Sequence, residues 1–190
     1  AYEIHERLVG SEMCIETEAN LWITLTPCPV ADTYKPIDVI TYEDKRFYYC
    51  NAKTLNLIPS CLAATAAERA NCSEAIFHRG DIVTECAHSN ISIFKDGCVI
   101  THQLDDKVLP GTARLRLLAF AEKLGYKTEE RDYTLDELMN ADEIIVHSTG
   151  SFCIPVKTVD GKAVGGKAPK MLKKIQDALV ADFEAQCAAE

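Results

Sequence analysis

Two residues of this sequence have the chemistry to act on a small organic molecule, Lys53 and Glu85. Lys53 lies in a polar turn ahead of an apolar helix, and a desolvated lysine becomes a nucleophile that can form a Schiff base. Glu85 ends a β-type run and precedes residues 86–90, whose small polar side chains leave room for a ligand ring. Taken singly, each residue is more often a solvated surface side chain.

Two further segments carry hydrogen-bond donors suited to an anion. Pro110-Gly111 opens an amphipathic helix, so the first amides of that helix are free at its N-terminus. Residues 147–151 (HSTGS) follow a buried-type strand and offer hydroxyl and amide donors to a phosphate. An ordinary capped helix and a turn that satisfies its own backbone are the simpler interpretations of these segments alone.

Together, a lysine, a carboxylate and two donor clusters make the set that pyridoxal phosphate requires. The lysine binds the aldehyde and later carries a proton. The carboxylate keeps the pyridine nitrogen protonated, so that the ring withdraws electrons, and the donors hold the phosphate. The sequence therefore predicts pyridoxal 5'-phosphate as the cofactor.

The elements that position these residues mix strands and helices without regular alternation. The expected strands are 21–26, 37–42, 47–50, 74–78, 82–85, 91–94, 98–101, 126–131, 143–147 and 152–159. The expected helices are 59–71, one from Pro110-Gly111 to Gly125, 135–139 and 167–187. A hairpin turn is expected at 95–97 and an N-cap at Thr134. This order predicts an α+β fold, a mixed or antiparallel sheet or barrel with packed helices.

The composition narrows the class of protein. The chain has 190 residues, 20 Lys+Arg against 29 Asp+Glu, a net charge of −9 and 47% apolar residues, as in an ordinary globular protein. The acidic balance argues against a nucleic-acid partner, and the sequence has no run of the ~20 apolar residues that span a membrane. The first 20 residues lack a secretory signal, and nine spread cysteines suit reduced thiols, so we expect a cytoplasmic protein.

No metal site is expected from residue spacing. No cysteine pair has CxxC spacing, and no histidine pair completes a zinc pattern. We interpret His5, His78, His102 and His147 as structural or surface residues, because none has a paired ligand or base at a suggestive spacing.

Four segments resemble the fold-type IV pyridoxal-phosphate enzymes, which include the class IV aminotransferases. The segments are KTLNLIPSCLAA, IVTECAHSNISIFKDG, LPGTARLRLL and DEIIVHSTGSFCIPV, in the order in which the family has them. The TECAHSN run, with GGKAP before the last helix, is most similar to D-amino acid aminotransferases. The resemblance implies transamination of D-amino acids with 2-oxo acids. Branched-chain transamination and aminodeoxychorismate cleavage are the alternatives.

The resemblance also implies roles for single residues around the cofactor ring. Lys53 matches the Schiff-base lysine and general acid/base, and Glu85 matches the partner of the pyridine nitrogen. Leu109 matches the apolar residue under the ring. His88 falls in the stretch that lies near the lysine and the cofactor in D-amino acid aminotransferases.

The implied phosphate ligands are the amides of Thr112 and Ala113 together with Ser148 and Thr149. Members of the family often have a threonine where Ala113 stands. The hydroxyl is absent here, which removes one phosphate hydrogen bond, worth about 1–3 kcal/mol with a charged acceptor.

Members of the family also carry a small N-terminal domain that is mostly missing from this sequence. Residues 1–19 show no clean hydrophobic period, and we expect them to be an atypical segment that is not native. Residues 20–50 are expected to be a remnant of the small domain and its linker, and residues 51–190 the large cofactor-binding domain. The resemblance further implies a homodimer that takes amino acids and 2-oxo acids. A truncated, non-catalytic fragment is the remaining alternative.

Overall fold

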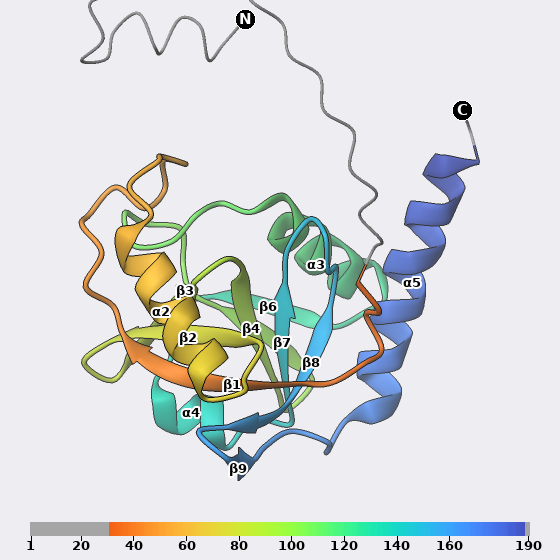
Figure 1. Cartoon of the computed structure of the whole chain (residues 1–190). Coiled ribbons are helices and arrows are strands. Elements are labelled where there is room, and N and C mark those ends of the chain that lie inside the picture. Colours follow the sequence, from red (N-terminus) through yellow and green to blue (C-terminus); the bar gives the residue numbers. More distant parts are fainter. Residues whose placement is uncertain (1–30, 189–190) are drawn as a thin grey trace, which may run out of the picture.

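The computed structural model describes residues 31–188, and Figure 1 shows this part as one mixed sheet with helices around it. Its elements in chain order are β1 (Ile37–Glu43), α2 (Ile58–Arg69), β2 (Glu74–Arg79), β3 (Ile82–Cys86), β4 (Asn90–Lys95), β5 (Cys98–Thr101), α3 (Thr112–Lys123), β6 (Lys127–Glu130), α4 (Leu135–Met139), β7 (Glu143–His147), β8 (Ile154–Val159), β9 (Lys162–Ala163) and α5 (Pro169–Cys187). The predicted α+β class is confirmed.

The strand order brings segments that are distant in sequence side by side. Along the sheet the order is β3-β2-β1-β8-β7-β4-β5-β6, and β9 pairs with β8. β1 runs parallel to both β2 and β8, and β5 runs parallel to β6, while the other pairs are antiparallel. Asn90, at the start of β4, lies opposite His147, at the end of β7. This register joins two of the segments that were singled out for chemistry.

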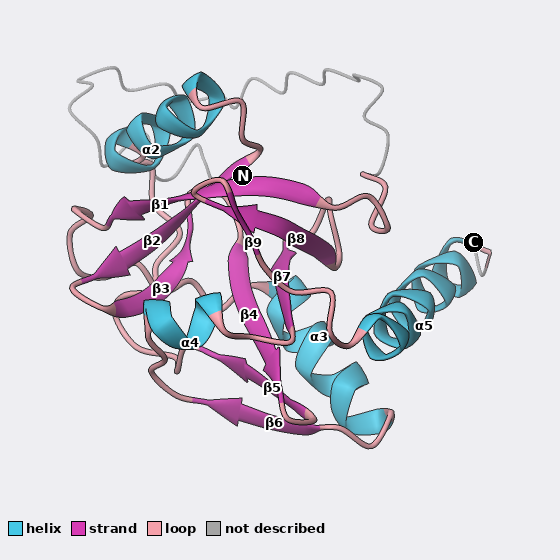
Figure 2. Ribbon diagram, turned by 90° about the horizontal axis from the view of Figure 1, so that it is seen from below, coloured by secondary structure: helices cyan, strands magenta, loops and turns pink. Residues whose placement is uncertain are grey.

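Three apolar clusters hold the helices against the sheet, which curls around them (Figure 2). The helix α2 contacts the sheet through small side chains, and its Ala63 and Ala67 pack on Ala75 and Phe77. α3 and α5 share a second cluster with β4, β5 and β7, and a third fills the space between the two ends of the sheet and α4. The small residues of α2 allow close approach of this helix to β1 and β2.

Most predicted elements are present within a residue or two of their expected bounds. The turn at Asp96-Gly97 has φ angles of 49° and 80°, which suits a two-residue hairpin loop. Thr134 caps α4 in a reciprocal box with Glu137, as its side chain accepts from the Glu137 amide at 3.1 Å. Gly125 follows α3 at φ 85°, where a residue without Cβ is favoured.

One predicted strand is wrong and another lies outside the description. Residues 47–50 form no strand: Tyr49 has a left-handed φ of 70°, and the Cys50 amide donates to the Asp106 carbonyl at 2.8 Å rather than to a neighbouring strand. The aromatic run has high β-propensity but no partner strand, so local preference does not decide its conformation. The strand expected at 21–26 lies outside the described residues.

The expected division at residue 50 stays a prediction. Within the described chain, residues 37–43 are β1, hydrogen-bonded between β2 and β8. Residues 1–19, expected to be an atypical segment, lie outside the described part. In that part no helix is both long and apolar enough to cross a membrane.

Candidate functional site

A cavity of about 510 Å³ opens between the segment that joins β1 to α2, the β3–β4 connection, the start of α3 and the residues after β7. The residues expected to hold the cofactor come from separate parts of the chain, and all of them line this cavity. They are Lys53, Glu85, His88, Leu109, Thr112, Ala113, Ser148 and Thr149. Folding therefore gathers the predicted set around one space.

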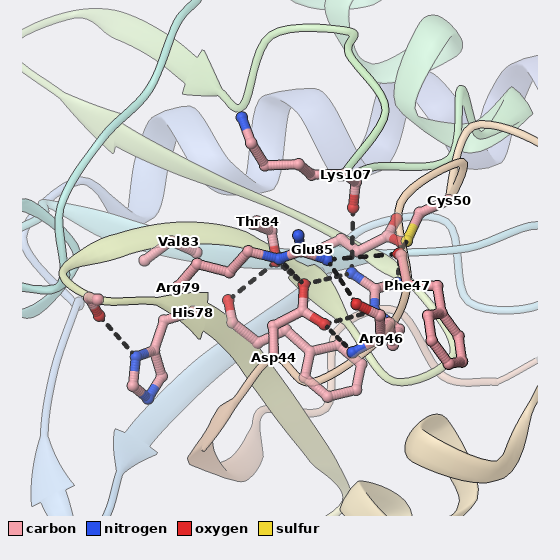
Figure 3. A network of polar contacts seen from close by, with 12 residues as sticks. Asp44, Arg46, Phe47, Cys50, His78, Arg79, Val83, Thr84, Glu85 and Lys107 are labelled. Atoms are coloured by element: carbon pink, nitrogen blue, oxygen red, sulfur yellow. Dashed lines mark hydrogen bonds and ion pairs between the residues drawn. The ribbon is translucent and has the colours of Figure 1, made fainter.

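Glu85 is fixed by donors on both carboxylate oxygens, and Figure 3 shows the contact with Arg46. Arg46 Nη1 donates to Oε1 in a short ion pair. Asn90 Nδ2 and the backbone amide of Leu109 each donate to Oε2 at 2.9 Å. Three groups of the described chain donate to Glu85, which fits an ionised carboxylate, because that group only accepts hydrogen bonds.

Burial and charge act in opposite directions on this carboxylate. Glu85 is 5% exposed, and its burial raises the pKa of the carboxyl above the ordinary value. The Arg46 guanidinium and the Leu109 amide lower the pKa and offset part of that rise. Glu85 is therefore a partly desolvated acceptor with its charge matched by one arginine.

Arg46 was missed by the sequence reasoning and is central to the geometry. Its Nε and Nη2 donate to Asp44 at 2.9 and 3.0 Å, Nη2 also donates to the Lys107 carbonyl at 3.0 Å, and its guanidinium lies 4.4 Å from the Phe77 ring centre. Arg46 lies in the charged run EDKR (residues 43–46), between the two segments 37–42 and 47–50 that were expected to be strands. Side chains two residues apart on an extended segment lie on the same face. The opposite charges of Asp44 and Arg46 could therefore have indicated that these two residues form an ion pair.

The donors for an anion come together at the other end of the cavity. α3 begins after Gly111 without a side-chain cap, so the first amides of the helix have no intrahelical partner. Thr112 Oγ1 lies 3.2 Å from Thr149 Oγ1, which links the start of α3 to the segment after β7. Ser148 Oγ is 2.6 Å from Ser151 Oγ. These amides and hydroxyls suit a phosphate group.

Lys53 reaches the cavity from the exposed segment between β1 and α2. Among residues 31–188 its side chain makes no hydrogen bond or ion pair that would fix it. The segment itself is tied by backbone bonds, with Cys50 donating to Asp106 and the Ala52 amide donating to the Tyr49 carbonyl at 3.0 Å. The lysine is placed by its backbone, and its amine is open to a reactant.

His88 lies at the edge of the cavity beside a buried carboxylate. Its Nδ1 is 3.6 Å from Glu74 Oε1, and its side chain is 63% exposed. Glu74 Oε2 accepts from Ser89 Oγ at 2.7 Å, and Oε1 accepts from the Ala75 amide at 2.9 Å. Glu74 thus anchors the 87–89 turn that forms one rim.

His147 was expected to be a structural or surface residue, and it lines the cavity. It is fully buried, and Nε2 lies 2.9 Å from Ser92 Oγ, while Nδ1 has no partner among the described residues. Burial, with a smaller effect from Arg114, lowers the pKa of His147 to about 3. The imidazole is therefore neutral at ordinary pH.

The sequence pattern and the fold together define a family. The family model described as "Amino-transferase class IV" matches residues 11–159. The protein belongs to the class IV aminotransferase family, which confirms the resemblance.

Known proteins resemble this chain over about half of their own length. A D-alanine aminotransferase of Listeria monocytogenes serotype 4b (strain F2365) is 41% identical over 150 residues, which cover 78% of this chain and 52% of that protein. The chain thus spans about half the length of the curated relatives it matches.

Solved structures agree on the fold. The branched-chain amino acid aminotransferase of Escherichia coli superposes with a TM-score of 0.72 at 26% identity, over 82% of this chain and 55% of that one. A second branched-chain amino acid aminotransferase, solved in complex with N-(5'-phosphopyridoxyl)-L-glutamate, has a TM-score of 0.68 at 26% identity. That match covers 75% of this chain and 51% of that one.

Proposed function

We propose that this chain is the cofactor-binding part of a pyridoxal-phosphate enzyme that transfers amino groups between D-amino acids and 2-oxo acids. The observation that supports this best is the cavity in which a lysine, a buried carboxylate and an anion-binding end face one space. Family membership supports the reaction class.

The residues present fit the cofactor in their chemistry. Glu85 is a carboxylate with its charge held by Arg46, as a partner of a protonated ring nitrogen requires. The uncapped start of α3 and the hydroxyls of Thr112 and Thr149 supply donors for a phosphate. When bound, pyridoxal phosphate supplies an aldehyde and an electron-withdrawing ring.

Each residue has a distinct task in the proposed reaction. Lys53 would hold the cofactor through its amine, and the same amine, when free, would take the proton from the substrate's α-carbon. Glu85 would keep a proton at the ring nitrogen and so would stabilise negative charge that develops at the reacting carbon. Leu109 lines the cavity and would offer an apolar surface to the ring, and His88 lies at the rim beside Glu74.

The phosphate is assigned to the start of α3 and the segment after β7. The backbone amides of Thr112 and Ala113 and the side chains of Ser148 and Thr149 are the proposed ligands. Ala113 contributes no hydroxyl, so the Thr112 hydroxyl, 3.2 Å from that of Thr149, is the side-chain donor on the helix.

The preference for D-amino acids rests on the D-alanine aminotransferases at about 40% identity. Branched-chain transamination is the second candidate, because branched-chain aminotransferases share the fold at 26% identity. Aminodeoxychorismate cleavage is a third reaction of the same cofactor. The proposal extends to a homodimer, as the sequence resemblance implies.

Because the chain spans about half of its relatives, cofactor binding and turnover need separate tests. For binding, the purified chain is titrated with pyridoxal phosphate and its visible absorbance is followed. We expect a band of lysine-bound cofactor that is absent from Lys53→Ala and retained in Lys45→Ala, whose lysine is exposed and paired with Glu43. A wild type without the band, or a band retained in Lys53→Ala, contradicts the proposed site.

For turnover, D-alanine, L-leucine and aminodeoxychorismate are assayed side by side, with 2-oxoglutarate as acceptor for the two amino acids. Conversion of D-alanine above the other two supports the proposed substrate class. Conversion of L-leucine or aminodeoxychorismate without D-alanine removes it and leaves the cofactor site in place. A chain that binds cofactor and converts none of the three is the non-catalytic fragment.

A further inference from the structure

A second group of potential ligands lies outside the cavity, where the chain leaves β5. His102 directly follows β5, Asp105 lies in the loop after it, and Asp132 lies just before α4. His102 Nε2 is 3.2 Å from Asp105 Oδ2 and 3.5 Å from Asp132 Oδ1. One ligand atom from each residue lies within 4.8 Å of the other two, so all three face one point.

The orientation of the His102 ring shows what this point requires. Its Nδ1 lies 2.8 Å from the Val83 carbonyl oxygen, which can only accept, so Nδ1 carries the proton. The other ring nitrogen, Nε2, points at two carboxylate oxygens, those of Asp105 and Asp132. The side chain is 1% exposed, so bulk water cannot separate these acceptors. A proton on Nε2 or a bound cation therefore lies between the ring and the carboxylates.

The neighbouring donors lie against the two carboxylates. Lys107 Nζ is 2.5 Å from Asp105 Oδ2, and Gln103 Nε2 donates to Asp132 Oδ1 at 3.2 Å. Among the described residues, Lys107 is the only lysine or arginine that forms an ion pair with either carboxylate.

We propose that His102, Asp105 and Asp132 bind a divalent first-row transition cation such as Mn²⁺ or Zn²⁺. One imidazole and two carboxylates form a suitable donor set. The separations of 3.2 and 3.5 Å match those between ligands that each lie about 2.1 Å from a shared metal. The Val83 carbonyl fixes the ring through its other nitrogen, as the second shell of a metal-bound histidine does.

The cation would brace the loop that carries part of the cavity wall. Between His102 and Leu109 this loop accepts a bond from Arg46 at the Lys107 carbonyl and one from Cys50 at the Asp106 carbonyl. Leu109 at its end donates to Glu85. The metal links the start of this loop to Asp132, so it stabilises the wall from outside the cavity. The inference does not depend on which cofactor the cavity takes.

Mn²⁺ is the probe of choice, because the nine cysteines of the chain compete for Zn²⁺. The chelator-treated full chain is titrated with Mn²⁺, and free Mn²⁺ is counted by electron paramagnetic resonance. We expect one bound ion per chain. Asp105→Asn, which keeps an oxygen acceptor for the Lys107 amide, should weaken binding beyond the ~10–100-fold cost of losing an outer-shell partner.

Two further variants keep the test decisive. Asp106→Asn removes the same charge from the adjacent position, whose side chain is outside the cluster, and should leave affinity within about threefold. Lys107→Met removes the competing ammonium and should tighten binding. The proposal is overturned if wild type and Lys107→Met bind no Mn²⁺, if Asp105→Asn and Asp106→Asn bind equally, or if nitrogen NMR shows Nε2 protonated with Mn²⁺ present.

Discussion

The two walls of the cavity are built differently. Glu85 is 5% exposed and receives three donors, and Arg46, which pairs with it, is held in turn by Asp44 and the Lys107 carbonyl. The opposite wall, residues 47–57, is open: Tyr49 is 76% exposed and Leu55 93%. The wall with Glu85 is thus preorganised by a polar network, whereas the segment with Lys53 is held by a few backbone bonds.

The difference in rigidity between the two walls matches the different roles proposed for Glu85 and Lys53. A group that must hold one charge in one place benefits from rigid, buried partners. A group that must bond, release and carry a proton needs an amine free of competing partners. The polar network around Glu85 therefore contributes to the stability of the fold, whereas the segment with Lys53 contributes little to stability and supplies the reactive amine.

Removing Arg46 tests the rigid wall most severely. Arg46→Met leaves two buried carboxylates, Glu85 and Asp44, without their shared cation, although Asp44 keeps Arg79 at 3.0 Å. We expect the free energy of unfolding to fall by about 3–5 kcal/mol, measured by urea denaturation. Adding Glu85→Gln to this variant should recover part of the loss, and a loss below about 1 kcal/mol would refute the network's role.

The buried, neutral His147 predicts that the free energy of unfolding depends on pH. Its pKa of about 3 lies below the ordinary value of 6.5, so between these values the unfolded chain binds the proton and the folded chain does not. Stability from this residue is complete above pH 6.5 and falls as the pH drops. By pH 4.5 the loss is on the order of 3 kcal/mol.

The control for this prediction is His147→Gln, compared with wild type by urea denaturation at pH 7 and pH 4.5. Other titrating groups contribute equally to both proteins, so the difference isolates the imidazole. The variant should lose less stability on acidification, and equal losses would show that His147 takes up a proton in the folded state.

Gly111 tests the junction between the Glu85 network and the start of α3. Its φ of −64° is ordinary, but a Cβ there would overlap Asn90 Oδ1. Asn90 would have to move and would lose its bonds to Glu85 and the Leu109 carbonyl. We expect Gly111→Ala to cost about 1–3 kcal/mol in unfolding free energy and to weaken pyridoxal-phosphate binding.

A double-mutant cycle sharpens this expectation. In an Asn90→Ala background the added methyl group no longer meets the amide, so Gly111→Ala should cost much less than it does alone. Additive costs in the two variants would mean that the clash acts elsewhere.

The open wall should show the smallest effects on stability. Leu55 is 93% exposed and Lys53 has no polar partner among the described residues. We expect Leu55→Ser and Lys53→Ala each to change the unfolding free energy by no more than about 0.5 kcal/mol. A loss above about 2 kcal/mol in either variant would show that the segment is packed, and would remove the contrast between the walls.

Local patterns predicted much of the fold but little of what surrounds Glu85. The hairpin at Asp96-Gly97 and the Thr134 cap are set by residues close in sequence, so their conformations follow from residue type. Arg46 acquires its role from Glu85, a residue 39 positions away. Burial of an arginine depends on partners brought by the sheet order, which a single sequence does not display.

The same limit explains the strand wrongly expected at 47–50 and the His102 cluster. Aromatic residues favour a strand only where another strand pairs with them, and none does here within the described chain. His102 and Asp132 meet because β5 and β6 are parallel neighbours. Sequence patterns for metal sites rely on ligands at short sequence separations, so they do not identify His102 and Asp132 as a pair.

The most direct test of the account maps where the cofactor attaches. The chain is mixed with pyridoxal phosphate, reduced with borohydride, digested and examined by mass spectrometry for phosphopyridoxyl-lysine. The account predicts one predominant label, on Lys53, with Lys45 and the other lysines labelled only at background. Label spread evenly over exposed lysines, or concentrated on a lysine outside the cavity, would contradict the assignment of this cavity as the cofactor site.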